Sequence, residues 1–116
     1  MLAVGGHMLG EVDERTIRIT TAFSGGVGST HAELCGALSA GVMLIGALHG
    51  RTRNGVDDQV CLELAAAYRN AFMQEFGCSE CQALRDRYND CPWLVERSSQ
   101  ILLGIIDESS ASDASR

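Results

Sequence analysis

The sequence predicts an all-α protein, a compact bundle of about five helices without a significant sheet. Apolar residues recur three and four positions apart over most of the chain, as they do on one face of an α-helix. Glycines, an Asn-Gly pair and the single proline fall mostly between these periodic stretches, where turns are expected. Length and composition agree with one globular domain, because 116 residues suffice for one core.

The first helix is expected over residues 11–23, where acidic residues open a stretch with helical apolar spacing. The β-branched run from Thr16 to Thr21 also fits a strand, and the pattern leaves that alternative open. Residues 24–29, SGGVGS, then form a glycine-rich turn. This turn lacks the lysine and the preceding strand of a phosphate-binding loop, so a tight turn is the favoured interpretation.

The stretch from Thr30 to Arg51 predicts a buried central helix around which the chain is organised. Thr30 and Glu33 have the spacing of a capping box, which places the helix at about residues 31–48, and Gly50 is a natural stop. Glycine and alanine along this helix permit close approach of a neighbouring backbone. Its uncharged run is shorter than the roughly 20 residues that a membrane span requires, so we expect a core helix and no membrane span.

Three further helices are expected in the second half of the chain. Apolar positions at helical spacing cover residues 57–76, and Gly77 ends that run. Ser79 with Gln82 predicts a capping box for a short helix to about residue 87. The last helix starts near Cys91-Pro92, because proline favours the first helical position. We expect the domain to comprise residues 1–106, followed by a disordered tail at 107–116.

The net charge, the first ten residues and the cysteine count limit the classes of protein to which this chain can belong. A net charge of −6 and a pI of about 4.9 give no basic footprint for nucleic acid or anionic lipid. The first ten residues do not read as a signal peptide, so we expect a cytoplasmic protein. Because the chain begins inside an apolar run, we also expect further residues upstream of Met1. Five cysteines, an odd number, then favour metal binding or redox chemistry over a disulfide scaffold.

The predicted helices place the cysteines in different settings, and a thiolate is favoured at a helix N-terminus. Cys81 falls in a first helical turn, Cys91 at an N-cap, and Cys35 in the second turn of the central helix, where the effect is weaker. Cys61 lies on the apolar side of its helix and is interpreted as an inert core residue. Cys78 and Cys81 form a C-x-x-C, a spacing shared by redox pairs and half zinc sites.

Spacing alone leaves three functions open: metal binding, thiol redox chemistry, and cysteines without chemistry. A site of four thiolates from Cys35, Cys78, Cys81 and Cys91 is geometrically conceivable. Such a site would hold zinc or an iron-sulfur cluster. The histidines at 7, 31 and 49 are interpreted as ordinary polar residues, and no Ser-His-acid arrangement is legible.

The same residues resemble a known family of small bacterial and archaeal redox-active proteins, named for its C, GCAxxG, C, C cysteine pattern. A domain of split-Soret cytochromes is similar. The agreement extends from about residue 11 to residue 106. The matching positions are Phe23, Gly25-Gly26, Cys35-Gly36-Ala37-Leu38-Ser39, Gly46, Gly50-Arg51, Phe72, Phe76-Gly77, Cys81 with Leu84, and Cys91 with Leu94-Val95.

The resemblance implies an all-helical domain in which Cys35, Cys81 and Cys91 come together as a redox or metal centre. It names no reaction. Two positions depart from the family: Ala40 stands where a glycine is expected, and the family's first cysteine would precede Met1. A four-cysteine centre would then need Cys78 or a residue from upstream.

Three hypotheses follow. The first is a cytoplasmic thiol redox protein, a candidate thiol oxidoreductase, in which Cys35, Cys81 and Cys91 converge and two of them form a reversible disulfide. Its redox partner is unknown. The second is an iron-sulfur or zinc centre held by the same thiolates with Cys78. The third is a helical interaction module that forms a homodimer through the small residues between Thr30 and Arg51.

Overall fold

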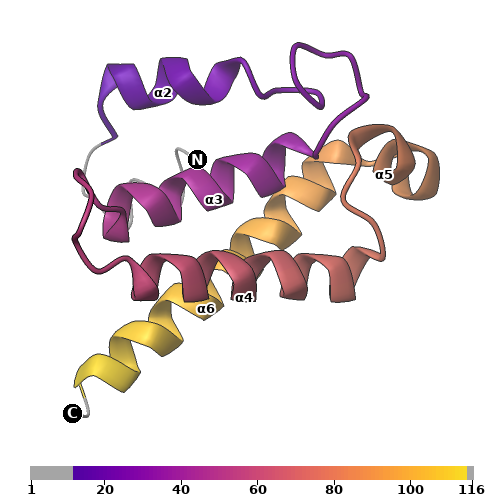
Figure 1. The fold of residues 1–116 in the computed structure, drawn as a ribbon. Helices are drawn as coiled ribbons and strands as arrows, with labels where there is room; N and C mark the ends of the chain where they lie inside the picture. The colour runs from indigo at the N-terminus through magenta and orange to yellow at the C-terminus, as the bar shows by residue number, and fades with distance from the viewer. Residues whose placement is uncertain (1–11, 115–116) are drawn as a thin grey trace.

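The computed structural model describes residues 12–114, which form an all-α fold (Figure 1). The predicted fold class is therefore confirmed, and residues 16–21 are helical and do not form a strand. The helices are α2 (Glu14–Thr21), α3 (Gly36–His49), α4 (Gln59–Phe76), α5 (Cys81–Tyr88) and α6 (Cys91–Ala114). Within the described residues, no helix combines the length and the hydropathy needed to span a bilayer.

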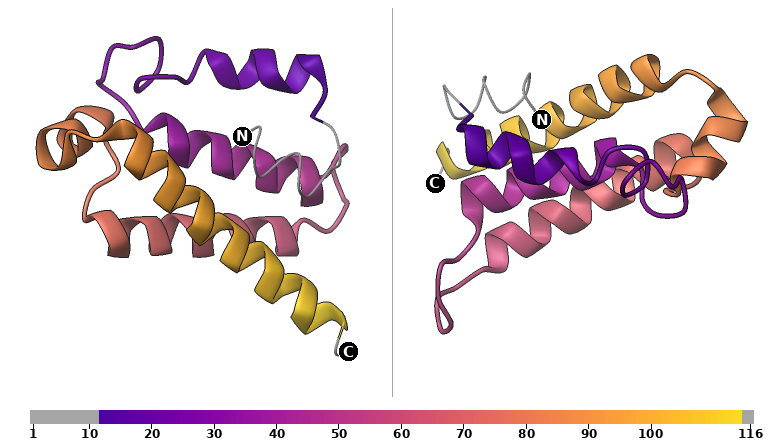
Figure 2. Two further views of the ribbon diagram at one scale, coloured as in Figure 1. Left: turned by 180° about the vertical axis from the view of Figure 1, so that it is seen from behind. Right: turned by 90° about the horizontal axis from the view of Figure 1, so that it is seen from above.

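The helices pack as one row with a single helix laid across it. Helices α3 and α4 run antiparallel, and α2 lies beside α3 on the side away from α4 (Figure 1). Helix α6 crosses one face of the α3–α4 pair diagonally (Figure 2). The short helix α5 lies at the end of the bundle where α3 and α6 begin and α4 ends (Figure 1). This end therefore gathers the starts of three helices.

The core is built on an aromatic column along α4. Tyr68, Phe72 and Phe76 recur every four residues, so they share one face of the helix, and each is at most 1% exposed. Phe72 and Phe76 meet edge to face with ring centroids 4.7 Å apart. Such pairs contribute about 0.5–1.5 kcal/mol beyond the burial of their area. Leu44 and Ile45 of α3 close the column on the other side and are fully buried.

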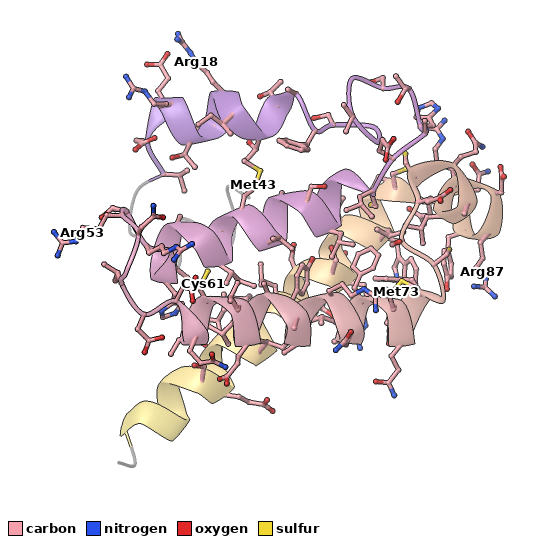
Figure 3. All side chains as sticks on the ribbon, viewed as in Figure 1. Arg18, Met43, Arg53, Cys61, Met73 and Arg87 are labelled. Carbon is pink, nitrogen blue, oxygen red and sulfur yellow. The ribbon has the colours of Figure 1, made fainter. Side chains whose placement is uncertain are left out.

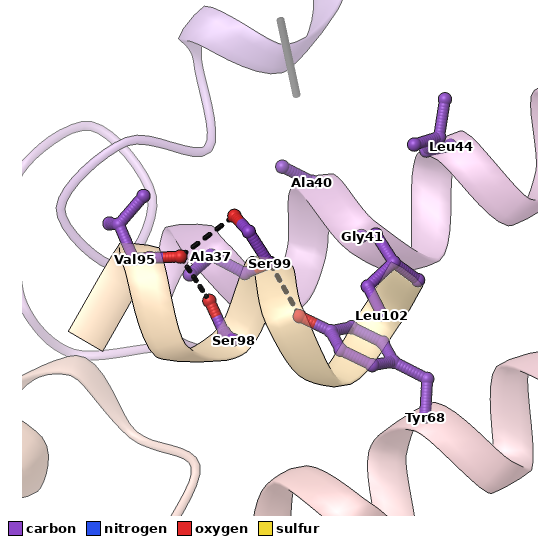
Figure 4. A pocket seen from close by; sticks show the side chains of 9 residues that line it. All are labelled: Ala37, Ala40, Gly41, Leu44, Tyr68, Val95, Ser98, Ser99 and Leu102. Carbon is purple, nitrogen blue, oxygen red and sulfur yellow. Dashed lines mark hydrogen bonds between the residues drawn. The ribbon is translucent and has the colours of Figure 1, made fainter. Parts of the chain in front are cut away.

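Tyr68 reaches from α4 into the space between α3 and α6 (Figure 4). Its ring lies against Gly41 of α3, where a Cβ would overlap the ring atoms. Its hydroxyl donates to the backbone oxygen of Ala37, at 3.2 Å. Burial raises the pKa of Tyr68 to about 12, and an adjacent Ser98 hydroxyl opposes the rise. The hydroxyl therefore stays protonated at neutral pH and holds α3 close to α4.

Two helix boundaries differ from the sequence prediction. The central helix begins at Gly36, five residues after the expected start at His31, because residues 31–35 pair with another segment. The capping box of Thr30 is therefore not formed, and the Thr30 hydroxyl instead donates to carbonyls within its own turn. At the other end of the chain, α6 continues past Ile106 to Ala114.

Two glycines of α3 differ in what surrounds them, and this difference gives a matched test of packing. A Gly41→Ala Cβ meets the Tyr68 ring, so we expect the free energy of unfolding to fall by about 1–3 kcal/mol. At Gly46, no described atom beyond the helix's own backbone lies within 4 Å of the added Cβ. Gly46→Ala should therefore raise stability by up to about 1 kcal/mol through helix propensity.

Urea unfolding followed by circular dichroism measures both variants. Equal changes in the two would contradict the close approach of Tyr68 to Gly41.

Candidate thiol site

A short backbone pairing places Cys35 beside Cys81. Leu34 and Glu80 form an isolated antiparallel bridge, although they are far apart in the sequence. The Cys35 N-H donates to Ser79 O at 2.8 Å, and the Cys81 N-H donates to Glu33 O at 2.9 Å. Each cysteine directly follows a bridged residue, so the first residue of α5 and the N-cap of α3 lie next to each other.

The pairing also replaces the cap predicted for α5. The first N-H groups of a helix have no partner within the helix. The Cys81 and Gln82 N-H groups donate to Glu33 O and His31 O, so the loop before α3 satisfies them. The predicted capping box at Ser79 is wrong for this reason, and no side chain caps α5.

The glycine-rich turn covers this junction. Gly26 is buried with a left-handed φ of 69°, and a Cβ added there would lie 2.6 Å from the Cys81 Cβ. A positive φ is also found at Val27, Ser29 and His31, although residues other than glycine rarely adopt it. Left-handed residues of this kind cost about 1–2 kcal/mol each. Strain of this kind persists where the surrounding structure holds it, and it often occurs at functional sites.

Cys91 joins the two other thiols from α6. It is the first residue of that helix and is exposed. The cap is Asp90, whose carboxylate accepts from the Trp93 N-H at 3.0 Å, so the predicted N-cap position of Cys91 is shifted by one residue. All three thiols line one small pocket of about 40 Å³, together with Asp90 and other residues of α5 and α6.

A larger cleft adjoins the small pocket. It measures about 480 Å³ and is also lined by Cys35, Cys81 and Cys91. Its other walls come from α2, the glycine-rich turn, the first turns of α3, and Val95 of α6. Arg85 lines both spaces. The sequence-based site omitted Arg85, although its position four residues after Cys81 places it on the same face of α5.

The pKa of Cys35 is raised, whereas a helix start is expected to lower it. Burial raises the pKa of this thiol, and the N-H groups of Ala37 and Leu38, which favour the thiolate, oppose the rise only in part. The nearby Cys81 and Cys91 add to the rise, because neighbouring thiolates repel. The predicted lowering at Cys35 is therefore wrong: desolvation outweighs the dipole.

Two cysteines lie apart from the three. The half-buried Cys61 packs against the core from α4, at the opposite end of the bundle from α5 (Figure 3). Cys78 precedes α5 and is directed towards Phe76 O, 3.9 Å from its sulfur. It lines neither space that the three thiols share. Of the two cysteines in the C-x-x-C, only Cys81 lines the spaces that the three thiols share.

Zinc and iron-sulfur sites are typically held by four donor side chains. Within the described part of the chain, no group of three or more His, Cys, Asp or Glu side chains is arranged to hold a metal ion. The metal site predicted from Cys35, Cys78, Cys81 and Cys91 stays a prediction. His31 contributes a backbone carbonyl to the pairing, and His49 is exposed at the end of α3. His7 lies outside the described residues.

Gly26 and Gly28 provide a matched test of the turn over Cys81. Both have a left-handed φ, so replacement by alanine strains the backbone similarly at each. Only Gly26→Ala brings a Cβ into Cys81, and we expect it to lose about 1–3 kcal/mol more stability than Gly28→Ala. Chemical unfolding of both variants checks this, and equal losses would contradict the packing of the turn on Cys81.

The raised pKa of Cys35 predicts a shifted pH profile. The native state holds the Cys35 proton more tightly than the unfolded chain does. The raised pKa therefore stabilises the folded state in full at pH values below 9.0, the ordinary pKa of the thiol. It is lost as the pH rises through the raised native pKa. We expect the midpoint of iodoacetamide labelling at Cys35, measured by peptide mass spectrometry, to lie above that of the urea-unfolded protein. A native midpoint at or below the unfolded one would exclude burial as the dominant effect.

One known protein family matches most of the chain. Residues 1–105 match the family described as "Putative redox-active protein (C_GCAxxG_C_C)". No curated protein and no solved structure matches the chain. The match covers more than half of the sequence, and the chain belongs to the C_GCAxxG_C_C family.

Proposed function

We propose that Cys35, Cys81 and Cys91 form a thiol-disulfide redox centre, and that the protein acts as a thiol oxidoreductase. One observation carries the proposal: three thiols from the starts of three helices line the same pocket, although they are widely spaced in the sequence. The family description, redox-active, supports it at a coarser level. A cytoplasmic location suits such a centre, because structural disulfides are rare there and thiols remain available.

The exposure of the three thiols suggests a division of roles. Cys91 is exposed, whereas Cys81 is only 8% exposed and Cys35 is half-buried. A disulfide substrate approaching from solvent meets Cys91 first. We therefore assign the first attack to Cys91 and the second to one of the two inner thiols.

The steps balance without another oxidant. The Cys91 thiolate attacks one sulfur of the substrate disulfide, forming a mixed disulfide and releasing one thiol, which takes up the proton that Cys91 lost. Cys35 or Cys81, as a thiolate, then attacks the Cys91 sulfur and releases the second thiol. The substrate gains two electrons and two protons, and the protein is left with one internal disulfide. A dithiol returns the protein to its reduced state by the reverse exchange.

The proposal requires two of the three sulfurs to come into bonding distance in the pocket, because a disulfide needs Cα atoms within about 7 Å of each other. The pairing at Leu34 and Glu80 supplies a rigid link between two of the cysteine-bearing segments. A metal plays no part in any step. The homodimer stays a prediction, and two glycines of its proposed face already contact Tyr68 and the glycine-rich turn within the chain.

Diamide oxidation of the reduced protein tests the centre. We expect one internal disulfide that joins two of Cys35, Cys81 and Cys91, found by peptide mapping under non-reducing conditions. A limiting amount of a small disulfide should leave a mixed disulfide at Cys91. Cys91→Ser should abolish that adduct, and the variant Cys35→Ser or Cys81→Ser that accumulates it identifies the second thiol.

Cys61→Ser and Cys78→Ser are matched controls, because these residues line neither shared space. Both should oxidise as the unaltered protein does. Failure of every pair among the three cysteines to form a disulfide would refute the proposal. Anaerobic purification with metal analysis and a visible spectrum tests the metal alternative directly, and stoichiometric metal released by mutation of these cysteines would favour it.

A further inference from the structure

We infer that the larger cleft beside the thiols is a substrate site for a low-molecular-mass disulfide that carries a carboxylate. The inference rests on the proposed thiol exchange and adds the class of substrate. Its basis is the size of the cleft, the charge at its thiol end and the polarity of its walls.

Size separates the two spaces that the thiols share. The small pocket of about 40 Å³ holds a few water molecules at most. The cleft of about 480 Å³ falls within the roughly 300–1,000 Å³ of sites for small organic ligands. A disulfide of two short organic thiols therefore fits the cleft but not the pocket. Since Cys91 lines both spaces, a ligand in the cleft reaches the attacking sulfur.

Charge at the thiol end selects an anion. Among the described residues that line the cleft, Arg85 is the one charged side chain. The chain as a whole carries a net charge of −6, so Arg85 is opposite in sign to the protein's net charge. Asp90 lines the small pocket but not the cleft. A guanidinium binds a carboxylate with two parallel hydrogen bonds, which a lone ammonium cannot do.

The opposite wall offers acceptors and apolar surface. The hydroxyls of Thr20 and Thr21 both donate to Ile17 O, at 2.8 and 2.9 Å. Their hydroxyl hydrogens are therefore engaged, and their oxygens keep the capacity to accept a hydrogen bond from an amide or ammonium N-H. Ile17 and Val95 add apolar surface to the cleft. The preferred ligand thus has a carboxylate near its sulfur end, an N-H group farther away and a short apolar stem.

Three symmetric disulfides of similar size but different charge test the preference for an anion. They are 3,3′-dithiodipropionate, bis(2-hydroxyethyl) disulfide and cystamine, which carry negative, zero and positive charge. The rate of thiol release from each is measured against its concentration at low salt. We expect the dianion to react fastest and to saturate. Arg85→Gln should raise its apparent KM by at least about tenfold with little change in the maximal rate.

Arg69→Gln is the matched control. It removes the same charge from an exposed position on α4, where the side chain contacts only the neighbouring Asn70 among the described hydrogen bonds. It should leave the preference for the dianion unchanged. Loss of the preference in both variants would indicate long-range charge and overturn the assignment of Arg85.

Blocking the cleft tests its use independently of charge. Thr21 is exposed at the end of α2, so Thr21→Trp fills the cleft without burying a new group in the core. We expect it to slow all three disulfides at least fivefold, while iodoacetamide still labels Cys91 at the original rate. Insulin serves as a protein disulfide, and its reduction at a rate higher than the dianion's and unchanged by Thr21→Trp would overturn the inference.

The outcomes separate the inference from the proposed function. If diamide forms the internal disulfide but the three small disulfides react equally and Arg85→Gln has no effect, the substrate class is wrong and the redox centre stands. If no disulfide forms under any oxidant, the redox centre itself is wrong.

Discussion

The site depends on one backbone interaction, the pairing of the residues before α3 with those before α5. Three hydrogen bonds within this pairing join residues 31–35 to residues 79–82. Each N-H and C=O that they use would otherwise need water or a side-chain cap. Because the pairing takes the place of caps, it fixes where both helices begin. Cys35 and Cys81 are adjacent for that reason, not because of any attraction between the sulfurs.

The same interaction explains the strained turn. With residues 31–34 held against α5, the chain from Phe23 must return in a tight turn over Cys81, and Gly26 provides the space. This path requires a left-handed backbone conformation at Val27, which is unfavourable for a residue with a side chain. Cys35 packs against the hydrophobic core, and its burial governs the pKa of this thiol more strongly than the helix start does.

The core supports the site from the other side. The aromatic column of α4 ends at Phe76, whose backbone oxygen accepts from Tyr88 at 2.9 Å and so anchors α5. Tyr68 holds the first turn of α3 through Ala37. The starts of α3 and α5 thus rest on the most buried part of the protein. The thiol exchange that we propose would need little rearrangement in such a frame.

The sequence by itself determined the helical class, and its family resemblance named Cys35, Cys81 and Cys91 as the candidate thiols. Helical spacing of apolar residues depends on local geometry, so α4 and the end marked by Gly77 could be read directly. The start of α3, the cap of α5 and the pKa of Cys35 could not, because each depends on segments distant in the chain. Capping signals at Thr30 and Ser79 are local preferences worth about 1 kcal/mol, and the pairing between residues 31–35 and 79–82 overrides them. The tertiary structure also brought Arg85 to the thiols and opened the cleft beside them.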